Sequence, residues 1–437
     1  MARGCLLTRA GAAVAAQWSL EDDALLATPA GGLAEAYRLD EISGIGGDEY
    51  GIELSLGGGT VTLSRLGADG STLLAALRRA WPPARARALR LEGTGEPKRF
   101  TATVAAGDAA PRHASLVLYE DALLVAPDGA DVEPVFLGLV ATIAPEEATL
   151  SLRLAHWDGS STVVSKLAGQ AQEFADALLS RRARLAAEAT AVLAGALPTL
   201  AASARTTLAA RWLPGRALGR AELETICPGF GAAFAASWLA QLPRAAYAQV
   251  LLDWAEPARV FLGYGRPGLA PQGGSPAGTA PAAAAPAPAT PPASSAGARP
   301  LQGAASAPGG PPPPASAPAG ATAPPAADGR PPEPQILWVL AGRGECWFLE
   351  AASEQDWATY RFKGGDELPG LASRLMCAAQ FSREALYMPL EGLVGERSEM
   401  AIAARDLPFL RALRERFEGR VLHTGMESWR KGLDAGA

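Results

Sequence analysis

Residues 50–64 read YGIELSLGGGTVTLS, and this stretch decides the fold of the first part of the chain. Apolar residues alternate with small or polar ones along 50–56, which predicts a strand with one buried face. Three glycines at 57–59 supply a turn that tolerates positive φ. The alternation resumes along 60–64, so we expect an antiparallel hairpin.

A helix is predicted soon after this hairpin, because the next apolar residues have the spacing of one helical face. These residues are Leu73, Leu74, Leu77 and Trp81. Pro82 and Pro83 are expected to end the helix, since proline lacks the N–H that a helix interior requires.

The same order of elements occurs a second time. The tetrapeptide DALL at 23–26 recurs at 121–124, and each copy is followed by a proline and a glycine. In the second copy, alternation along 150–154 and a return strand at 162–167 flank a turn. A helical face follows, formed by Phe174, Leu178 and Leu185. We therefore predict two repeats, repeat 1 at 1–92 and repeat 2 at 93–195.

A run of strands closed by one helix resembles the pleckstrin-homology-like (PH-like) fold, and the pair is similar to tandem PH-like proteins of bacterial type. The resemblance implies two β-sandwiches, each capped by a C-terminal helix, and a role in docking peptides or partner surfaces. Lipid-binding members of that family carry a basic cluster in an early hairpin loop. The corresponding turns here, 28–32 and 126–129, contain no Lys or Arg, so phosphoinositide binding is not expected.

The remainder of the chain predicts an α+β fold. Residues 196–257 are rich in alanine and are interrupted by prolines, which predicts a small helical bundle. Residues 335–437 predict a C-terminal α+β module, which we also consider as a third, diverged PH-like unit. Its expected strands are 336–341, 346–351, 358–363, 385–390 and 399–404. Its expected helices are 367–380 and a last helix capped by Asp406, whose apolar stripe runs from Leu407 to Val421.

Between these parts lies a segment of unusual composition. Residues 266–334 hold 20 of the 36 prolines and no Phe, Trp or Tyr. Such a segment cannot bury enough apolar surface to offset its ordering entropy, so we predict a disordered Pro/Ala/Gly-rich linker. The preceding residues, 258–265, predict a strand. Since a lone strand is unstable, it could pair with 335–340, which would place the linker inside one domain.

Composition argues against several classes of protein. The net charge of −6 and the pI of about 5.4 are unlike those of nucleic-acid-binding domains. Four cysteines without a CxxC pair and three dispersed histidines predict no metal site, and we expect no cofactor. Outside 266–334, the longest uncharged stretch is 225–243, which contains two glycines and two prolines and predicts a buried helix. A cytoplasmic protein is expected.

One cluster of charge remains as a candidate interaction patch. Its members are Arg78, Arg79, Arg85, Arg87, Arg90, Lys98 and Arg99. Cations near a helix C-terminus are favourable in any case. The patch could also contact an acidic partner protein or an anionic membrane. We therefore expect a non-enzymatic interaction or scaffold protein that docks an unknown partner or self-associates through its modules. Peripheral membrane binding through the patch and an unrecognised enzyme are the alternatives.

Overall fold

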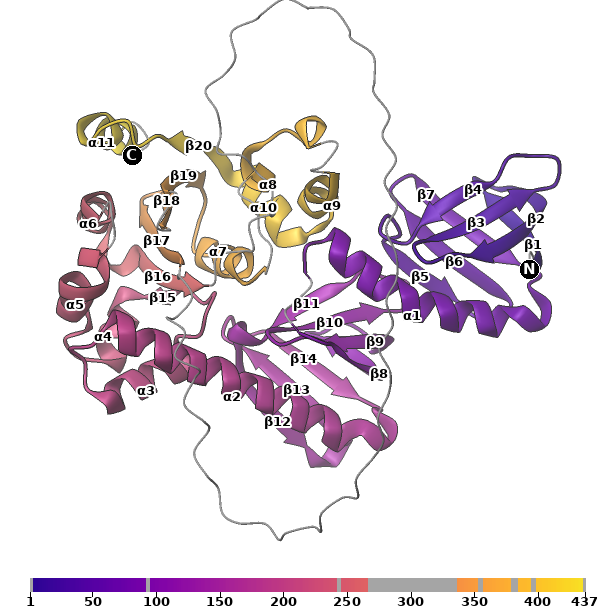
Figure 1. Cartoon of the computed structure of the whole chain (residues 1–437), viewed down its shortest axis with the longest axis horizontal. Coiled ribbons are helices and arrows are strands. Elements are labelled where there is room, and N and C mark those ends of the chain that lie inside the picture. Colours follow the sequence, from indigo (N-terminus) through magenta and orange to yellow (C-terminus); the bar gives the residue numbers. More distant parts are fainter. Residues whose placement is uncertain are drawn as a thin grey trace, which may run out of the picture. The chain divides into compact units, whose positions relative to one another are not determined.

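A computed structural model describes residues 3–91, 95–241, 245–265, 336–352, 357–378, 384–393 and 398–434. All of them belong to one compact unit. The predicted linker, 266–334, lies outside the described residues. The fold class is α+β, as predicted: two seven-stranded antiparallel sheets, each followed by a long helix, then a helical segment and a third antiparallel sheet with helices (Figure 1).

Repeat 1 is a seven-stranded sheet followed by helix α1 (Gly70–Ala88). Its strands are β1 (Arg3–Arg9), β2 (Ala12–Leu20), β3 (Ala24–Pro29), β4 (Glu35–Arg38), β5 (Gly44–Gly47), β6 (Gly51–Leu56) and β7 (Gly59–Ser64). They pair in the order β4-β3-β2-β1-β7-β6-β5. β1 therefore joins the meander β1–β4 to the meander β5–β7. The predicted hairpin is β6–β7, in which Ile52 lies opposite Leu63.

Repeat 2 has the same strand order, β11-β10-β9-β8-β14-β13-β12, followed by helix α2 (Ala171–Ala196). Its strands are β8 (Lys98–Ala106), β9 (Arg112–Leu118), β10 (Ala122–Pro127), β11 (Glu133–Phe136), β12 (Val140–Glu146), β13 (Ser151–His156) and β14 (Ser161–Ser165). The predicted helical face is buried at Phe174, Leu178 and Leu185. Leu150 was expected in β13, but it lies before the strand with a φ of 47° and is 85% exposed.

The helical segment joins repeat 2 to the third sheet. Its helices are α3 (Ala202–Arg211), α4 (Arg220–Ile226), α5 (Phe230–Ala233), the π-helix η5 (Phe234–Leu239) and α6 (Ala245–Trp254). α3 packs on α2. Trp212 donates its indole N–H to Leu262 O, and Tyr264 donates its hydroxyl to Trp212 O at 2.7 Å. These aromatic residues therefore fix the segment to the third sheet, and the packing of α3 on α2 fixes it to repeat 2.

The third sheet has six strands in the order β15-β16-β17-β18-β19-β20. They are β15 (Leu218–Gly219), β16 (Val260–Gly265), β17 (Ile336–Arg343), β18 (Cys346–Ala352), β19 (Trp357–Lys363) and β20 (Phe417–Val421). β16 pairs with β17 from Val260–Ala341 to Gly265–Ile336. Two neighbouring strands of one sheet thus come from opposite sides of 266–335, so the C-terminal module is not attached through that segment alone.

The elements of the C-terminal module correct four predictions. Its helices are α7 (Leu368–Cys377), α8 (Glu384–Tyr387), α9 (Ser398–Asp406), α10 (Pro408–Arg416) and α11 (Met426–Asp434). Strands were predicted at 385–390 and 399–404, where α8 and α9 occur. Asp406 ends α9 rather than capping the last helix, and Phe417 begins strand β20 instead of continuing α10. With helices between β19 and β20, the element order differs from that of the repeats.

Short 3-10 helices complete the fold: η1 (Gly67–Asp69), η2 (Leu137–Leu139), η3 (Glu147–Thr149), η4 (Ala168–Gln170), η6 (Pro257–Arg259) and η7 (Leu390–Gly392). No helix in the part of the chain that the structure describes is long and apolar enough to span a membrane.

Candidate functional site along helix α1

Helix α1 positions most of the predicted patch, and it continues through the two prolines that were expected to end it. Pro83 has no N–H to donate to the carbonyl of Arg79, one turn earlier. The guanidinium of Arg99, on β8, donates to that carbonyl at 2.9 Å instead. The last turns are also held by burial, since Arg85, Ala86 and Ala88 are buried. Tertiary contacts therefore outweigh the cost of the prolines.

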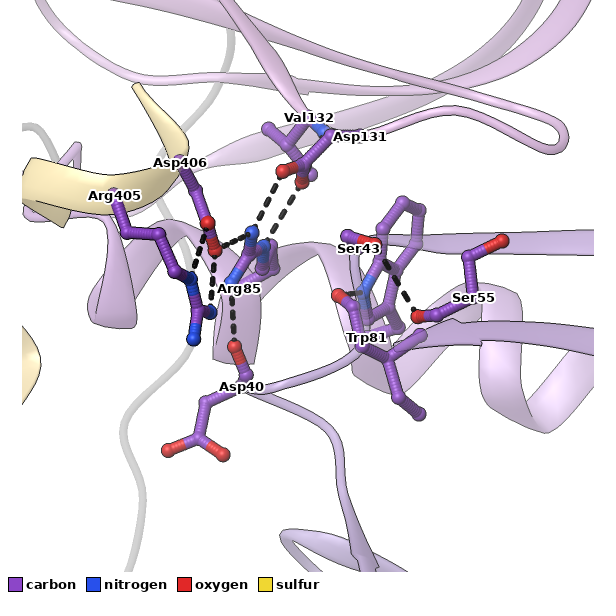
Figure 2. Close-up of polar contacts among 10 residues, drawn as sticks. Asp40, Ser43, Ser55, Trp81, Arg85, Asp131, Val132, Arg405 and Asp406 are labelled. Carbon is purple, nitrogen blue, oxygen red and sulfur yellow. Dashed lines mark hydrogen bonds and ion pairs between the residues drawn. The ribbon is translucent and has the colours of Figure 1, made fainter. Parts of the chain in front are cut away.

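Arg85 is the centre of a buried ion-pair cluster. Its side chain is 0% exposed and is bidentate to Asp131, with Nε at 2.9 Å and Nη2 at 2.6 Å. It also donates to Asp406 Oδ2 at 2.6 Å and to Asp40 O at 2.7 Å. Figure 2 shows the guanidinium between these groups. Arg85 thus connects α1 to the β10–β11 turn of repeat 2 and to the end of α9.

The electrostatics of this cluster favour its charged form. Burial by itself would raise the pKa of Asp406, but hydrogen bonds from Arg405 and Arg85 outweigh it, so the pKa lies below its ordinary value. Burial likewise opposes the charge of Arg85, and the hydrogen bonds and charges of Asp131 and Asp406 raise its pKa. The cluster therefore acts as a structural link between three parts of the fold.

The other patch residues differ in what they contact. Arg78 forms an ion pair with Asp128 at 2.6 Å, and Lys98 forms one with Glu173 at 3.2 Å. Arg78 and Arg90 are half-buried, whereas Arg79, Arg87, Lys98 and Arg99 are exposed. The ion pair of Arg78 thus joins the two repeats, that of Lys98 lies within repeat 2, and the other exposed members of the patch face solvent.

Two adjoining grooves follow α1, and both include Ala75, Arg79 and Arg99. The first, of about 610 Å³, is lined by small residues, by the cations Arg79, Arg87 and Arg99 and by the carboxylates Asp22 and Asp23. The small residues, which we call the floor, are Ala75, Ala76, Ala80, Pro83 and Ala84.

The second groove, of about 460 Å³, reaches β8 and β9 of repeat 2. Phe100, His113 and Ser115 lie along it, and His113 Nδ1 is 3.4 Å from Asp128. The two grooves together offer shallow apolar floors bordered by charges of both signs.

A second polar cluster lies in the C-terminal module, and sequence reasoning missed it. Glu350 and His423 are buried, with Oε1 and Nε2 3.0 Å apart. Thr359 donates its hydroxyl to Glu350 Oε2, lies 3.2 Å from the same His423 Nε2 and accepts from Trp429 at 2.9 Å. A hydrolytic triad requires the acid and the nucleophile on opposite ring nitrogens. Here both are at Nε2, so this arrangement fixes α11 and does not form a relay.

The cysteines are poorly suited to nucleophilic chemistry. Burial raises the pKa of Cys5, Cys227, Cys346 and Cys377, and the thiolate is the reactive form. Within the described ranges, no three His, Cys, Asp or Glu side chains are grouped so that they could hold a metal ion. No family model and no curated protein matches the chain.

Proposed function

We propose that the two repeats are PH-like modules of the bacterial tandem type and that the protein is a non-enzymatic interaction protein. Its partner binds along α1. The observation that carries the proposal is the pair of adjoining grooves, in which exposed Arg79 and Arg99 border a floor of alanines. The partner is expected to present an extended or helical segment with acidic side chains that meet these arginines.

A polypeptide is favoured over an anionic membrane because the grooves are not uniformly basic. Asp22 and Asp23 line the first groove together with its arginines, and Lys98 and Arg78 form ion pairs with Glu173 and Asp128. A bilayer that attracts cations would repel those carboxylates. Flotation with anionic vesicles at low and high salt distinguishes the two, since a membrane-binding protein floats at low salt.

The direct test is affinity capture with the full chain and two charge-reversal variants. Arg79→Glu inverts an exposed groove cation, whereas Arg430→Glu inverts an exposed cation on α11. We expect the proteins captured by the wild-type chain to be captured also by the Arg430→Glu variant but not by the Arg79→Glu variant. Equal retention by both variants would contradict the groove as the binding site, and the absence of any partner of the wild type would contradict the function.

A further inference from the structure

The β1–β2 hairpin of repeat 1 ends in an exposed, uncharged surface. Its turn, Ala10–Gly11, has positive φ at both positions (47° and 82°), as a tight two-residue hairpin requires. Residues 10–15 are all exposed, and so is most of the adjacent β3–β4 turn. Neither 10–15 nor 29–34 contains a charged residue. We call these two segments together the repeat 1 tip.

The repeat 1 tip leaves a strand edge open. The β2–β3 register ends at Ala16 opposite Pro29, and Ala15 O accepts one further bond from Ala30 N at 2.8 Å. Alternate residues of an antiparallel strand direct their backbone groups to the same side. Ala13 therefore directs its N–H and C=O to the side of β3, beyond the point where β3 turns away. An edge of this kind is a template for pairing with another strand.

Two large apolar side chains of the repeat 1 tip are exposed. Val14 is on the core-facing side of β2, in line with buried Ala16 and Trp18, but it is 45% exposed. Leu33, in the β3–β4 turn, is 89% exposed. The charged groups nearest in sequence, Arg9 and Glu35, pair with each other at 3.5 Å. The surface has no net charge and therefore does not repel a copy of itself.

Repeat 2 treats the equivalent edge differently. His113 O accepts from Asp128 N at 2.8 Å, as Ala15 O does from Ala30 N, so Pro111 and Arg112 correspond to Ala13 and Val14. Proline and charge are the means by which proteins protect edge strands from pairing. The same chain thus blocks the edge in repeat 2 and leaves it open in repeat 1.

The counterpart of the β3–β4 turn in repeat 2, the β10–β11 turn, packs against repeat 1. In repeat 2, Gly129 N donates to Ile45 O on the edge strand β5, and Asp131 binds Arg85. Gly44 and Gly46 allow this close approach, because a Cβ at Gly44 would lie 3.3 Å from Ala130 N. The corresponding turn of repeat 1 carries Leu33 in place of Asp131 and contacts no such edge among the described residues.

We propose that the repeat 1 tip is a homodimer interface. Two copies of the chain pair their β2 edges antiparallel across a two-fold axis, which brings the residue 12–15 segments together and buries Val14 and Leu33. A second copy is the occupant because the edge is uncharged and self-complementary. The inference rests on the proposed function in that it names one docking surface of an interaction protein and what binds there.

Sedimentation velocity of the full chain tests the interface at about 1 to 100 µM, a range that reports micromolar association. We expect a species of twice the 44.9 kDa chain mass. Val14→Arg copies Arg112 of repeat 2 and places like charges at the interface, so it should weaken dimerisation about 100-fold or more. Leu150→Arg changes an equally apolar, 85% exposed residue elsewhere and should leave the dimer intact.

Three results would overturn the interface: a monomeric wild type over this range, a Val14→Arg variant that dimerises like the wild type, or open-ended oligomers. Circular dichroism of each variant shows that it is folded. The α1 grooves do not take part, so Arg79→Glu should dimerise normally. If the chain does not dimerise but still captures a partner, only this interface is rejected. If it dimerises but captures no partner, only the proposed function is rejected.

Discussion

Replacing Arg85 with methionine should strongly destabilise the protein. Methionine keeps most of the apolar stem but leaves Asp131 and Asp406, 29% and 15% exposed, without the guanidinium that neutralises them. Breaking a buried pair in this way costs about 3–5 kcal/mol. Asp406 keeps Arg405 as a partner at 2.6 Å, so we expect the lower end, about 3 kcal/mol.

Urea unfolding followed by tryptophan fluorescence measures this loss. Arg38→Met is the matched control, because its ion pair with Asp40 is exposed on the arginine side and should contribute less than about 1 kcal/mol. A loss below about 1 kcal/mol for Arg85→Met would refute the view that this cluster joins the modules, because it is the size expected of a surface pair.

Arg85→Met should also change how the free energy of unfolding depends on pH under acidic conditions. The folded pKa of Asp406 lies below its unfolded value, so its contribution is complete above a pH of about 4 and is lost as the pH falls further. Without Arg85 the folded pKa moves toward the unfolded value, and the stability of the variant should fall less steeply below pH about 4 than that of the wild type. If the free energy of unfolding falls equally steeply below pH about 4 in both proteins, Arg85 does not lower the pKa of Asp406.

Two further substitutions test local packing. Arg99→Met removes the donor to Arg79 O and should lower the free energy of unfolding in urea by about 1 kcal/mol. The control Lys98→Met removes a surface ion pair and should lower it less. Equal effects would mean that the Arg99 bond does not compensate for Pro83. Gly263→Ala would place a Cβ 2.1 Å from the ring of Trp338 and should destabilise the protein by about 1–3 kcal/mol. An unchanged urea midpoint would show that the β16–β17 contact is looser than described.

The two repeats could be predicted because their signals are local. The alternation of 50–56 and 60–64 around three glycines specifies a hairpin without information from elsewhere in the chain. The helical faces that begin at Leu73 and Phe174 are equally local. The antiparallel sheets and their closing helices were therefore accessible from the sequence.

The mistaken elements are those decided by tertiary packing. The sequence predicted that α1 ends at Pro82 and Pro83. The helix continues because Arg99, on strand β8, donates to the carbonyl that the missing N–H of Pro83 leaves without its helical partner. The segment 399–404 was predicted as a strand, although Met400, Ala403, Ala404 and Leu407 have helical spacing and are buried together. That spacing is a signal that could have found α9.

The candidate site was only partly predictable. The patch residues are close in sequence, but Arg85 binds Asp131 and Asp406, which are 46 and 321 residues away, so nothing near it indicated burial. In the second cluster, Glu350 and Thr359 lie on neighbouring strands, but His423 is 64 residues from Thr359, so the sequence did not indicate this contact. Charge composition predicts a patch, whereas only the fold separates its structural members from its exposed ones.

The most direct test of the proposed docking along α1 is site-specific photo-cross-linking. A photoreactive amino acid replaces Ala75, which lies in both grooves, and in a control chain it replaces exposed Ala202 at the start of α3. The account predicts a cross-linked partner from position 75, lost when Arg79→Glu is added, and none from position 202. Cross-links of equal yield from both positions, or from position 202 alone, would contradict it.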